Sequence, residues 1–172
     1  MTAMVVFESM FGGTQAVAEA IGAGIASCGL PVDVVEVGRM VGAGEHEAWP
    51  VEDALLLAVG GPTHLRTLSS ERTRATARSH GTVVSALTGL DHWLTVAGPV
   101  VRGRPVAAFD TSWGTQDAGS AAAVIARRLE ELEGRLVAPA RTFLVTGEST
   151  GPSPAELEQA WEWGRGLVAR LA

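Results

Sequence analysis

The segment at residues 55–59 is continuously apolar and is followed at once by Gly60, Gly61 and Pro62. An uninterrupted apolar run of this length, closed by turn residues, predicts a β-strand that is buried on both faces. Such strands are typical of parallel sheets, which are covered by helices on both sides. The segment therefore favours an α/β fold.

The apolar pattern elsewhere supplies the other strands and the helices. Strands are predicted at residues 4–7, 32–37, 106–109 and 141–145, and helices at residues 14–27, at residues 121–132 and after Pro154. Residues 41–50, rich in glycine and acidic residues, predict a loop with a weak helical turn. The alternation predicts a three-layer, doubly wound α/β fold with five parallel strands. With 172 residues, the chain is expected to form a single domain over residues 1–172.

Residues 61–105 form a connection much longer than the usual few residues, and long connections tend to be functional. It contains one helical stretch opening near Ser70 and a second around residues 90–96. Its net charge is +4, whereas residues 1–60 carry −7 and residues 106–172 carry −3. Two interpretations are open. Arg74 and Arg78 cover apolar surface on a solvated helix, or the segment forms an anion-recognition rim beside a pocket.

Composition excludes several kinds of chemistry. The chain has no Lys, Tyr or Asn, so a P-loop lysine, a lysine Schiff base, a tyrosine acid and N-glycosylation are all excluded. Cys28 is the single cysteine, and with four scattered histidines it gives no metal pattern. The net charge of −6 disfavours nucleic acid and anionic membranes as partners. Without a signal peptide or an apolar run of about 18 residues, we expect no membrane span and a reducing, cytoplasmic setting.

The loops after three strands are the expected ligand site, because ligands of open parallel sheets bind at the carboxyl ends of the strands. In the first loop, the amides of Gly12, Gly13 and Thr14 open a helix, and Ser9 and Thr14 add hydroxyl groups. These neutral donors suit a phosphate group. The alternative is a plain glycine-rich turn in which Ser9 or Thr14 caps the helix. Dinucleotide and Walker fingerprints are absent.

The first loop, Ser9-Met10-Phe11-Gly12-Gly13-Thr14, resembles the flavodoxin phosphate loop S/T-x-T-G-N-T. Phe11 replaces the middle hydroxyl residue and Gly13 replaces the asparagine. The loop is also similar to the Ser-Met-Tyr-Gly form of flavodoxin-like NAD(P)H:quinone reductases. The resemblance implies a flavodoxin-like fold with strand order 2-1-3-4-5 and FMN as cofactor, and the unsplit fifth strand region is typical of a short-chain form.

The second and third loops extend the resemblance over nearly the whole chain. Residues 60–65 are similar to the reductases' G-x-P-T segment, where the family contacts the flavin ring. Residues 111–119 resemble the segment beside the ring, where Trp113 is the candidate stacking residue. Local hydrogen bonding of His64, and packing of Trp113 over the next helix, are the alternatives, and Trp49, Trp93, Trp161 and Trp163 are expected to pack. The cofactor-binding residues implied by these two loops are Pro62, Thr63, His64, Leu65, Thr111, Ser112, Trp113, Gly114 and Gly119.

Three functions follow from this interpretation. The preferred one is an FMN-binding electron carrier between redox partner proteins, a reductase or an oxidase. The second is a small FMN-dependent NAD(P)H:quinone oxidoreductase, in which Arg66, Arg72, Arg74 and Arg78 meet a pyridine-nucleotide phosphate, although no catalytic acid or base is identified. The third is a flavodoxin-fold protein that has lost FMN and acts through protein contacts. The sequence does not predict the oligomeric state.

Overall fold

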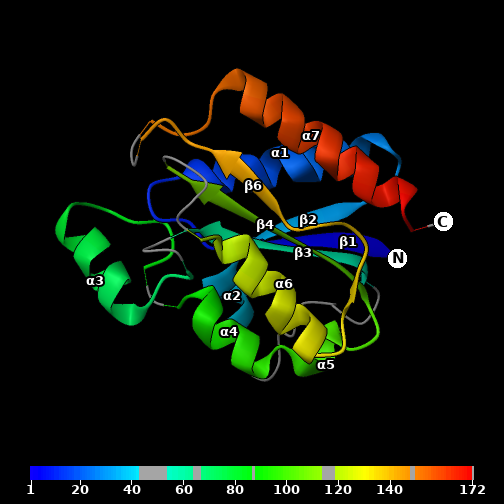
Figure 1. Cartoon of the computed structure of the whole chain (residues 1–172), viewed down its shortest axis with the longest axis horizontal. Coiled ribbons are helices and arrows are strands. Elements are labelled where there is room, and N and C mark those ends of the chain that lie inside the picture. Colours follow the sequence, from blue (N-terminus) through cyan, green and yellow to red (C-terminus); the bar gives the residue numbers. More distant parts are fainter. Residues whose placement is uncertain (43–53, 64–66, 87, 114–118, 148–149, 172) are drawn as a thin grey trace.

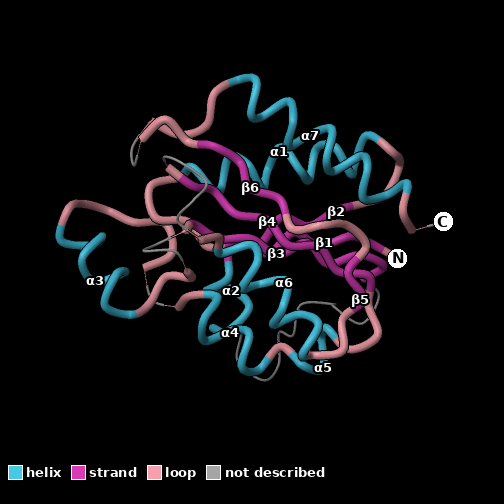
Figure 2. The backbone as a smooth tube through the Cα atoms, viewed as in Figure 1, coloured by secondary structure: helices cyan, strands magenta, loops and turns pink. Residues whose placement is uncertain are grey.

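A computed structural model describes residues 1–42, 54–63, 67–86, 88–113, 119–147 and 150–171 of the chain. Its central feature is a parallel sheet in the order β2-β1-β3-β4-β5, with β6 also paired to β4 (Figures 1 and 2). The strands are β1 (Thr2–Phe7), β2 (Val32–Glu36), β3 (Ala54–Pro62), β4 (Pro105–Ser112), β5 (Arg135–Leu136) and β6 (Arg141–Leu144). The helices are α1 (Gly13–Ser27), α2 (Val37–Gly42), α3 (Glu71–Ser79), α4 (Leu90–Val96), α5 (Gly98–Val101), α6 (Ala121–Glu131) and α7 (Pro154–Ala169).

Helices cover both faces of the sheet (Figure 1). On one face, α1 and α7 pack over an apolar cluster that includes Ile21, Phe109 and Leu167. On the other face, α4, α5 and α6 pack over a second cluster that includes Trp93 and Ile125. The central strands β1, β3 and β4 therefore alternate their buried side chains between two separate cores. This arrangement confirms the three-layer α/β fold and the predicted strand order.

The fifth position of the sheet is filled by two short segments. β5 pairs with Pro105 and Val106 at the start of β4, and β6 pairs with residues 109–112 at its end. Val137 N–H still donates to Val106 O at 2.9 Å, and residues 138–140, which include Pro139, then interrupt the pairing. Since proline lacks the N–H that a ladder needs, a continuous strand is not expected here.

α3 projects away from the sheet and its covering helices (Figure 1), and we call residues 67–86, which include it, the α3 lobe. α3 begins with a capping box, in which the Ser70 hydroxyl accepts from Thr73 N–H and the Thr73 hydroxyl oxygen accepts from Ser70 N–H. The helix opening predicted near Ser70 is thus confirmed. Within the part of the chain that the structure describes, no helix has both the length and the apolar character needed to cross a membrane. The cytoplasmic location stays a prediction.

Candidate functional site

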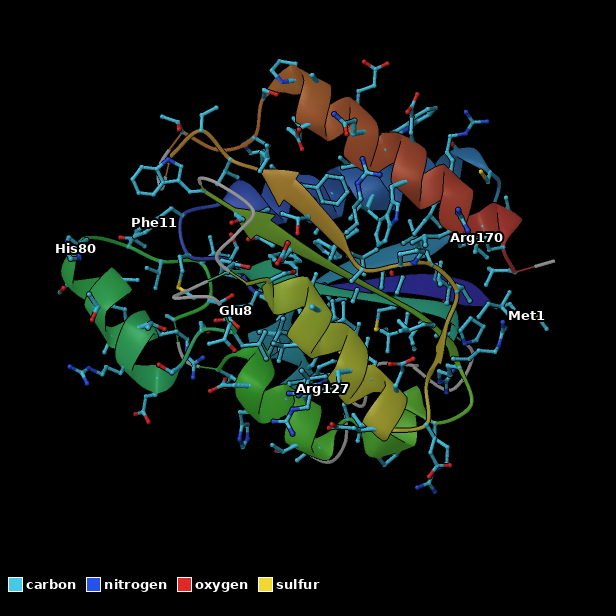
Figure 3. The ribbon with its side chains drawn as sticks, viewed as in Figure 1. Met1, Glu8, Phe11, His80, Arg127 and Arg170 are labelled. Atoms are coloured by element: carbon cyan, nitrogen blue, oxygen red, sulfur yellow. The ribbon has the colours of Figure 1, made fainter. Side chains whose placement is uncertain are left out.

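A cleft opens at the carboxyl ends of β1, β3 and β4, where the sequence analysis expected a ligand. Its volume is about 170 Å³ within the described residues. The lining residues are Ser9, Met10, Phe11, Gly13, Thr14, Pro62, Thr63, Thr111, Trp113, Val145 and Gly147. Figure 3 shows Phe11 and Glu8 at this end of the sheet, close to the α3 lobe. The three predicted loops therefore meet at one site.

The first loop leaves the start of α1 open toward this cleft. Gly12 adopts the left-handed conformation with φ of +91°, which a glycine tolerates without strain. The ladder of α1 begins with Ala16 N–H donating to Gly12 O at 3.0 Å, so the N–H groups of residues 13–15 have no acceptor within the helix. The Ser9 hydroxyl accepts from Gly12 N–H at 3.1 Å, and no side chain caps the helix. The alternative in which Ser9 or Thr14 caps α1 is therefore wrong.

Hydroxyl groups tie the three loops together. Thr14 Oγ1 lies 2.7 Å from Thr111 Oγ1, which joins the first loop to the third. Thr63 N–H donates to Thr111 O at 2.9 Å, and its hydroxyl donates to Asp110 at 2.7 Å. Asp110 also accepts from Ala122 N–H at 2.9 Å and so fixes the start of α6. The loops are thus held by neutral hydroxyls and one buried carboxylate.

Trp113 lies at the edge of the cleft and leaves 68% of its surface exposed. It follows directly after β4, and the alternative in which it packs over α6 is not supported by so large an exposed surface. Trp93 and Trp163, in contrast, pack in the two cores, Trp163 edge-on against Phe109 and Phe143. The prediction that these two tryptophans are packing residues is confirmed.

The remaining predicted site residues divide into three groups. Gly12 and Ser112 neighbour lining residues in the chain without lining the cleft themselves, and Gly119 is an exposed glycine with φ of +88°. His64, Leu65 and Gly114 lie outside the described residues, as does Trp49, which was expected to pack. Val145 and Gly147, which follow β6, line the cleft but were not predicted. They follow the carboxyl end of the strand at the fifth position of the sheet. The rule that ligands bind at the carboxyl ends of parallel strands, which located the other three loops, therefore also indicates these two residues.

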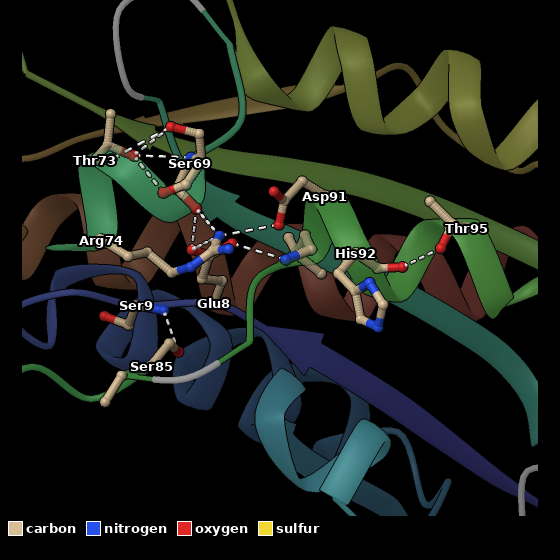
Figure 4. Close-up of polar contacts among 12 residues, drawn as sticks. Glu8, Ser9, Ser69, Thr73, Arg74, Ser85, Asp91, His92 and Thr95 are labelled. Atoms are coloured by element: carbon tan, nitrogen blue, oxygen red, sulfur yellow. Dashed lines mark hydrogen bonds and ion pairs between the residues drawn. The ribbon is translucent and has the colours of Figure 1, made fainter.

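Arg74 is not available to a ligand in the cleft. Its side chain is buried, and Nη1 lies 2.9 Å from Asp91 Oδ1, 2.9 Å from Ser69 Oγ and 3.6 Å from Glu8 Oε1 (Figure 4). Glu8 Oε2 accepts from Leu90 N–H at 2.9 Å. Arg74 therefore joins the α3 lobe to β1 and α4.

The expectation that Arg74 meets a phosphate group is wrong, because its buried guanidinium group is bonded to Ser69 and Asp91 and lies beside Glu8. The alternative, in which Arg74 covers apolar surface on a solvated helix, is not what the structure shows either, because Arg74 is buried among polar and charged groups. Arg72 and Arg78 lie exposed on α3, where Arg78 donates to Ala86 O, and Arg66 lies outside the described residues.

Glu8 is fully buried directly before the first loop. Burial raises the pKa of its carboxyl above the usual value of 4.5. Hydrogen bonds from Ser69 and from Leu90 N–H, and the charge of Arg74, oppose this rise, while the charge of Asp91 adds to it. Glu8 is thus a buried titratable group next to the first loop in the chain, outside the cleft lining, and among the described lining residues none is a cation.

No family model matches the sequence, and no curated protein matches it. Solved structures do match. A flavodoxin from the domain Archaea has a TM-score of 0.69 and 24% identity over 99% of each chain. Flavodoxin 1 of Bacillus cereus has a TM-score of 0.66 and 16% identity over the whole of both chains.

A flavodiiron protein of Giardia intestinalis has a TM-score of 0.69 and 20% identity. The match covers 99% of this chain and 36% of that one, so this chain spans about a third of the Giardia protein. At these identities the likeness shows the fold. The chain has a flavodoxin-like fold, with the same class of sheet as these proteins.

Proposed function

We propose that this chain binds FMN at the described cleft and carries electrons between redox partner proteins. The observation that carries the proposal is the meeting of the first and third loops, joined by the hydroxyls of Thr14 and Thr111, at the open start of α1. Trp113 completes the cleft with an exposed aromatic ring. The flavodoxin-like fold of the chain supports the same ligand class.

The residues of the first loop fit the phosphate end of FMN. Helix N-termini bind anions because their N–H groups lack acceptors and the helix dipole favours negative charge. In this chain the N–H groups of residues 13–15 and the hydroxyls of Ser9 and Thr14 would be the donors. A Cβ at Gly13 would lie 3.4 Å from Val145 Cγ1, so the segment after β6 packs directly against the loop at the position where the flavodoxin pattern has asparagine.

The residues of the other two loops fit the ring end. Trp113 would cover one face of the isoalloxazine ring and exclude water from it, while Pro62 and Thr63 contribute the adjoining wall. Bound FMN would supply reversible electron transfer, and the chain would supply orientation and electrostatics. The net charge of −6 disfavours further negative charge on the ring and steers positively charged partners toward the protein.

The reductase alternative has lost part of its support. Arg74, one of the four arginines on which it depended, is held by Glu8 and Asp91. We therefore place the carrier first. Steady-state oxidation of NAD(P)H with a quinone, measured on FMN-loaded protein, distinguishes the two functions, because a carrier alone sustains no such turnover.

The test of FMN binding is the absorbance spectrum of the purified protein, followed by removal of any flavin and titration with FMN and with riboflavin. We expect FMN to bind more tightly, since riboflavin lacks the phosphate group. Ser9→Ala should weaken FMN by about 1 kcal/mol and leave riboflavin nearly unchanged. Ser27→Ala, at the far end of α1, is the matched control. A colourless protein that FMN does not titrate would leave the cofactor-free interaction protein as the function.

A further inference from the structure

We propose that Ser85 of the α3 lobe is a positioning residue for the first loop, and that it sets the affinity of the cleft for the phosphate group of its ligand. The effect on affinity rests on the proposed function, in which that ligand is FMN. The positioning itself concerns the loop alone.

Both main-chain polar groups of Ser9 are bonded to Ser85. Ser85 N–H donates to Ser9 O at 2.8 Å. Ser9 N–H donates to Ser85 Oγ at 3.0 Å, the bond drawn in Figure 4. Val84 N–H continues the pairing by donating to Met10 O at 2.9 Å. Ser85 is 1% exposed, so water does not compete for these bonds. The backbone of the first loop is therefore fixed by a segment 76 residues further along the chain.

Glu36 orients the Ser85 hydroxyl. The hydroxyl donates its single proton to Glu36 Oε1 at 2.6 Å, and this leaves its lone pairs for Ser9 N–H. Glu36 is the last residue of β2, and Ser9 follows β1. The end of β2 and the end of β1 are thus bridged by one side chain from the lobe.

Apolar contacts hold the same loop from the lobe side. Met10 is 3% exposed and clusters with Ala77 and Val83, and Phe11 and Ala86 pack against this cluster. This contact explains why an aromatic residue stands at position 11, where the flavodoxin pattern has a hydroxyl. Phe11 docks the lobe, and the Ser9 hydroxyl remains for the ligand.

Ser85 should therefore affect the two ends of the ligand differently. The Ser9 hydroxyl and the α1 N–H groups form the phosphate end of the cleft, and their placement depends on Ser85. Thr63 and Trp113 lie at the ring end, and among the described residues the hydrogen bonds of Ser85 run to Ser9 and Glu36 and to neither of these two. Loss of the Ser85 hydroxyl should therefore weaken binding of the phosphate group and spare binding of the ring.

The first experiment measures dissociation constants of FMN and riboflavin for Ser85→Ala, with Ser79→Ala as the matched control. Ser79 lies in the same lobe, and its hydroxyl bonds to neighbouring residues of that lobe, donating to Thr76 O at 2.6 Å and lying 3.4 Å from His80 Nδ1. Ser85→Ala should weaken FMN about five- to tenfold and riboflavin less than twofold. Ser79→Ala should change neither. Equal losses for both ligands, or no loss, would overturn the proposal.

Glu36 provides the second pair of variants. Glu36→Gln keeps an oxygen that accepts from Ser85 and should bind FMN like the wild type. Glu36→Ala leaves the hydroxyl without its acceptor and should weaken FMN about two- to threefold. Thermal unfolding shows which variants are folded at the temperature of the titration, and Glu36→Ala tests the proposal should Ser85→Ala fail to fold.

Amide hydrogen exchange of the flavin-free protein separates this proposal from the proposed function. Ser85→Ala should accelerate exchange at Ser9 N–H, which loses its acceptor, at least about tenfold relative to Ser79→Ala. If wild-type protein binds no FMN while Ser9 exchange responds in this way, the proposed function fails and the positioning role stands. Unchanged exchange at Ser9 would refute the positioning role whether or not FMN binds.

Discussion

Trp113 is the residue whose environment best distinguishes a flavin site from a packing role. If its exposed ring stacks on bound flavin, Trp113→Ala should weaken FMN and riboflavin alike by about 1–2 kcal/mol, because both ligands carry the ring. FMN should also quench less fluorescence in the variant than in the wild type. Titrations followed by tryptophan emission measure both effects. Identical quenching and unchanged affinity would make Trp113 a surface residue without a ligand role.

Glu8 predicts a specific dependence of stability on pH. Because burial raises the pKa of its carboxyl, the folded state binds a proton that the unfolded state releases above about pH 4.5. The stability that this proton contributes is complete below that value and is lost as pH rises through the raised pKa. Glu8→Gln cannot titrate, so the free energy of unfolding of the wild type should fall relative to that of the variant over this range.

Urea unfolding at a series of pH values measures this difference. Glu158→Gln, an exposed position on α7, removes the same charge and serves as the control. The charged groups facing Glu8 are Arg74 and Asp91, and both remain in the Glu8→Gln protein. If the free energy of unfolding of the wild type stays level or rises relative to that of Glu8→Gln as pH increases, the direction of the pKa shift is contradicted.

At the scale of elements, helices α1 and α7 pack closely against one another. A Cβ at Gly24 would lie 2.0 Å from Trp161 O, and a Cβ at Gly164 would lie 2.2 Å from Ile21 O. The two helices therefore approach until backbone meets backbone. No flexible side chain is present that could move aside for an added methyl group at either position.

Gly164→Ala should therefore destabilise the protein by about 1–3 kcal/mol, and Gly24→Ala by a similar amount. Gly166→Ala is the control in the same helix. Its Cβ would meet Arg170 Nη1 at 3.0 Å, the end of a flexible side chain, and alanine is the better helix former by about 0.5–1 kcal/mol. Chemical denaturation of the three variants measures the contrast. A stabilised Gly164→Ala protein would show that the helices separate at little cost.

The sequence predicted the elements whose signals are local. Residues 90–96 form a helix as expected, and Ser70 caps the next helix upstream, because apolar spacing and capping residues act within one turn. Residues 37–42 form α2, where the end of a strand at Val37 and, from Val41, a loop with a weak helical turn were expected. The valines within residues 32–37 favoured a strand that continues through Val37, and packing of α2 against α4 outweighs that preference.

The candidate site was predictable to the extent that parallel strands end at one edge. This rule located Ser9, Thr63 and Trp113 together. Contacts between distant segments carry no local signal, so the bond between Ser9 and Ser85 and the burial of Arg74 among Glu8, Ser69 and Asp91 were not predicted. A lone arginine in a polar helix looks the same in sequence whether it faces water or a buried carboxylate.

For the whole molecule, FMN binding should raise the thermal unfolding temperature. A ligand that binds only the folded state stabilises it by about 2.7 kcal/mol at one hundred times its dissociation constant. At equal concentrations riboflavin should raise the midpoint less than FMN does, and Ser9→Ala should reduce the shift produced by FMN. Scanning calorimetry over a range of FMN concentrations measures these shifts. A midpoint independent of FMN concentration would argue against binding to the folded chain.

The interruption between β5 and β6 has a consequence for how copies of this chain meet one another. Exposed strand edges are templates for unwanted pairing between chains, and proteins protect them with short strands, charges and proline. This edge presents two residues, then Pro139 and its neighbours, then four residues, with Arg135 and Arg141 at the two strand starts. A foreign strand would find no continuous row of N–H and carbonyl groups there. The interrupted fifth position thus disfavours edge-to-edge pairing between chains at this edge of the sheet.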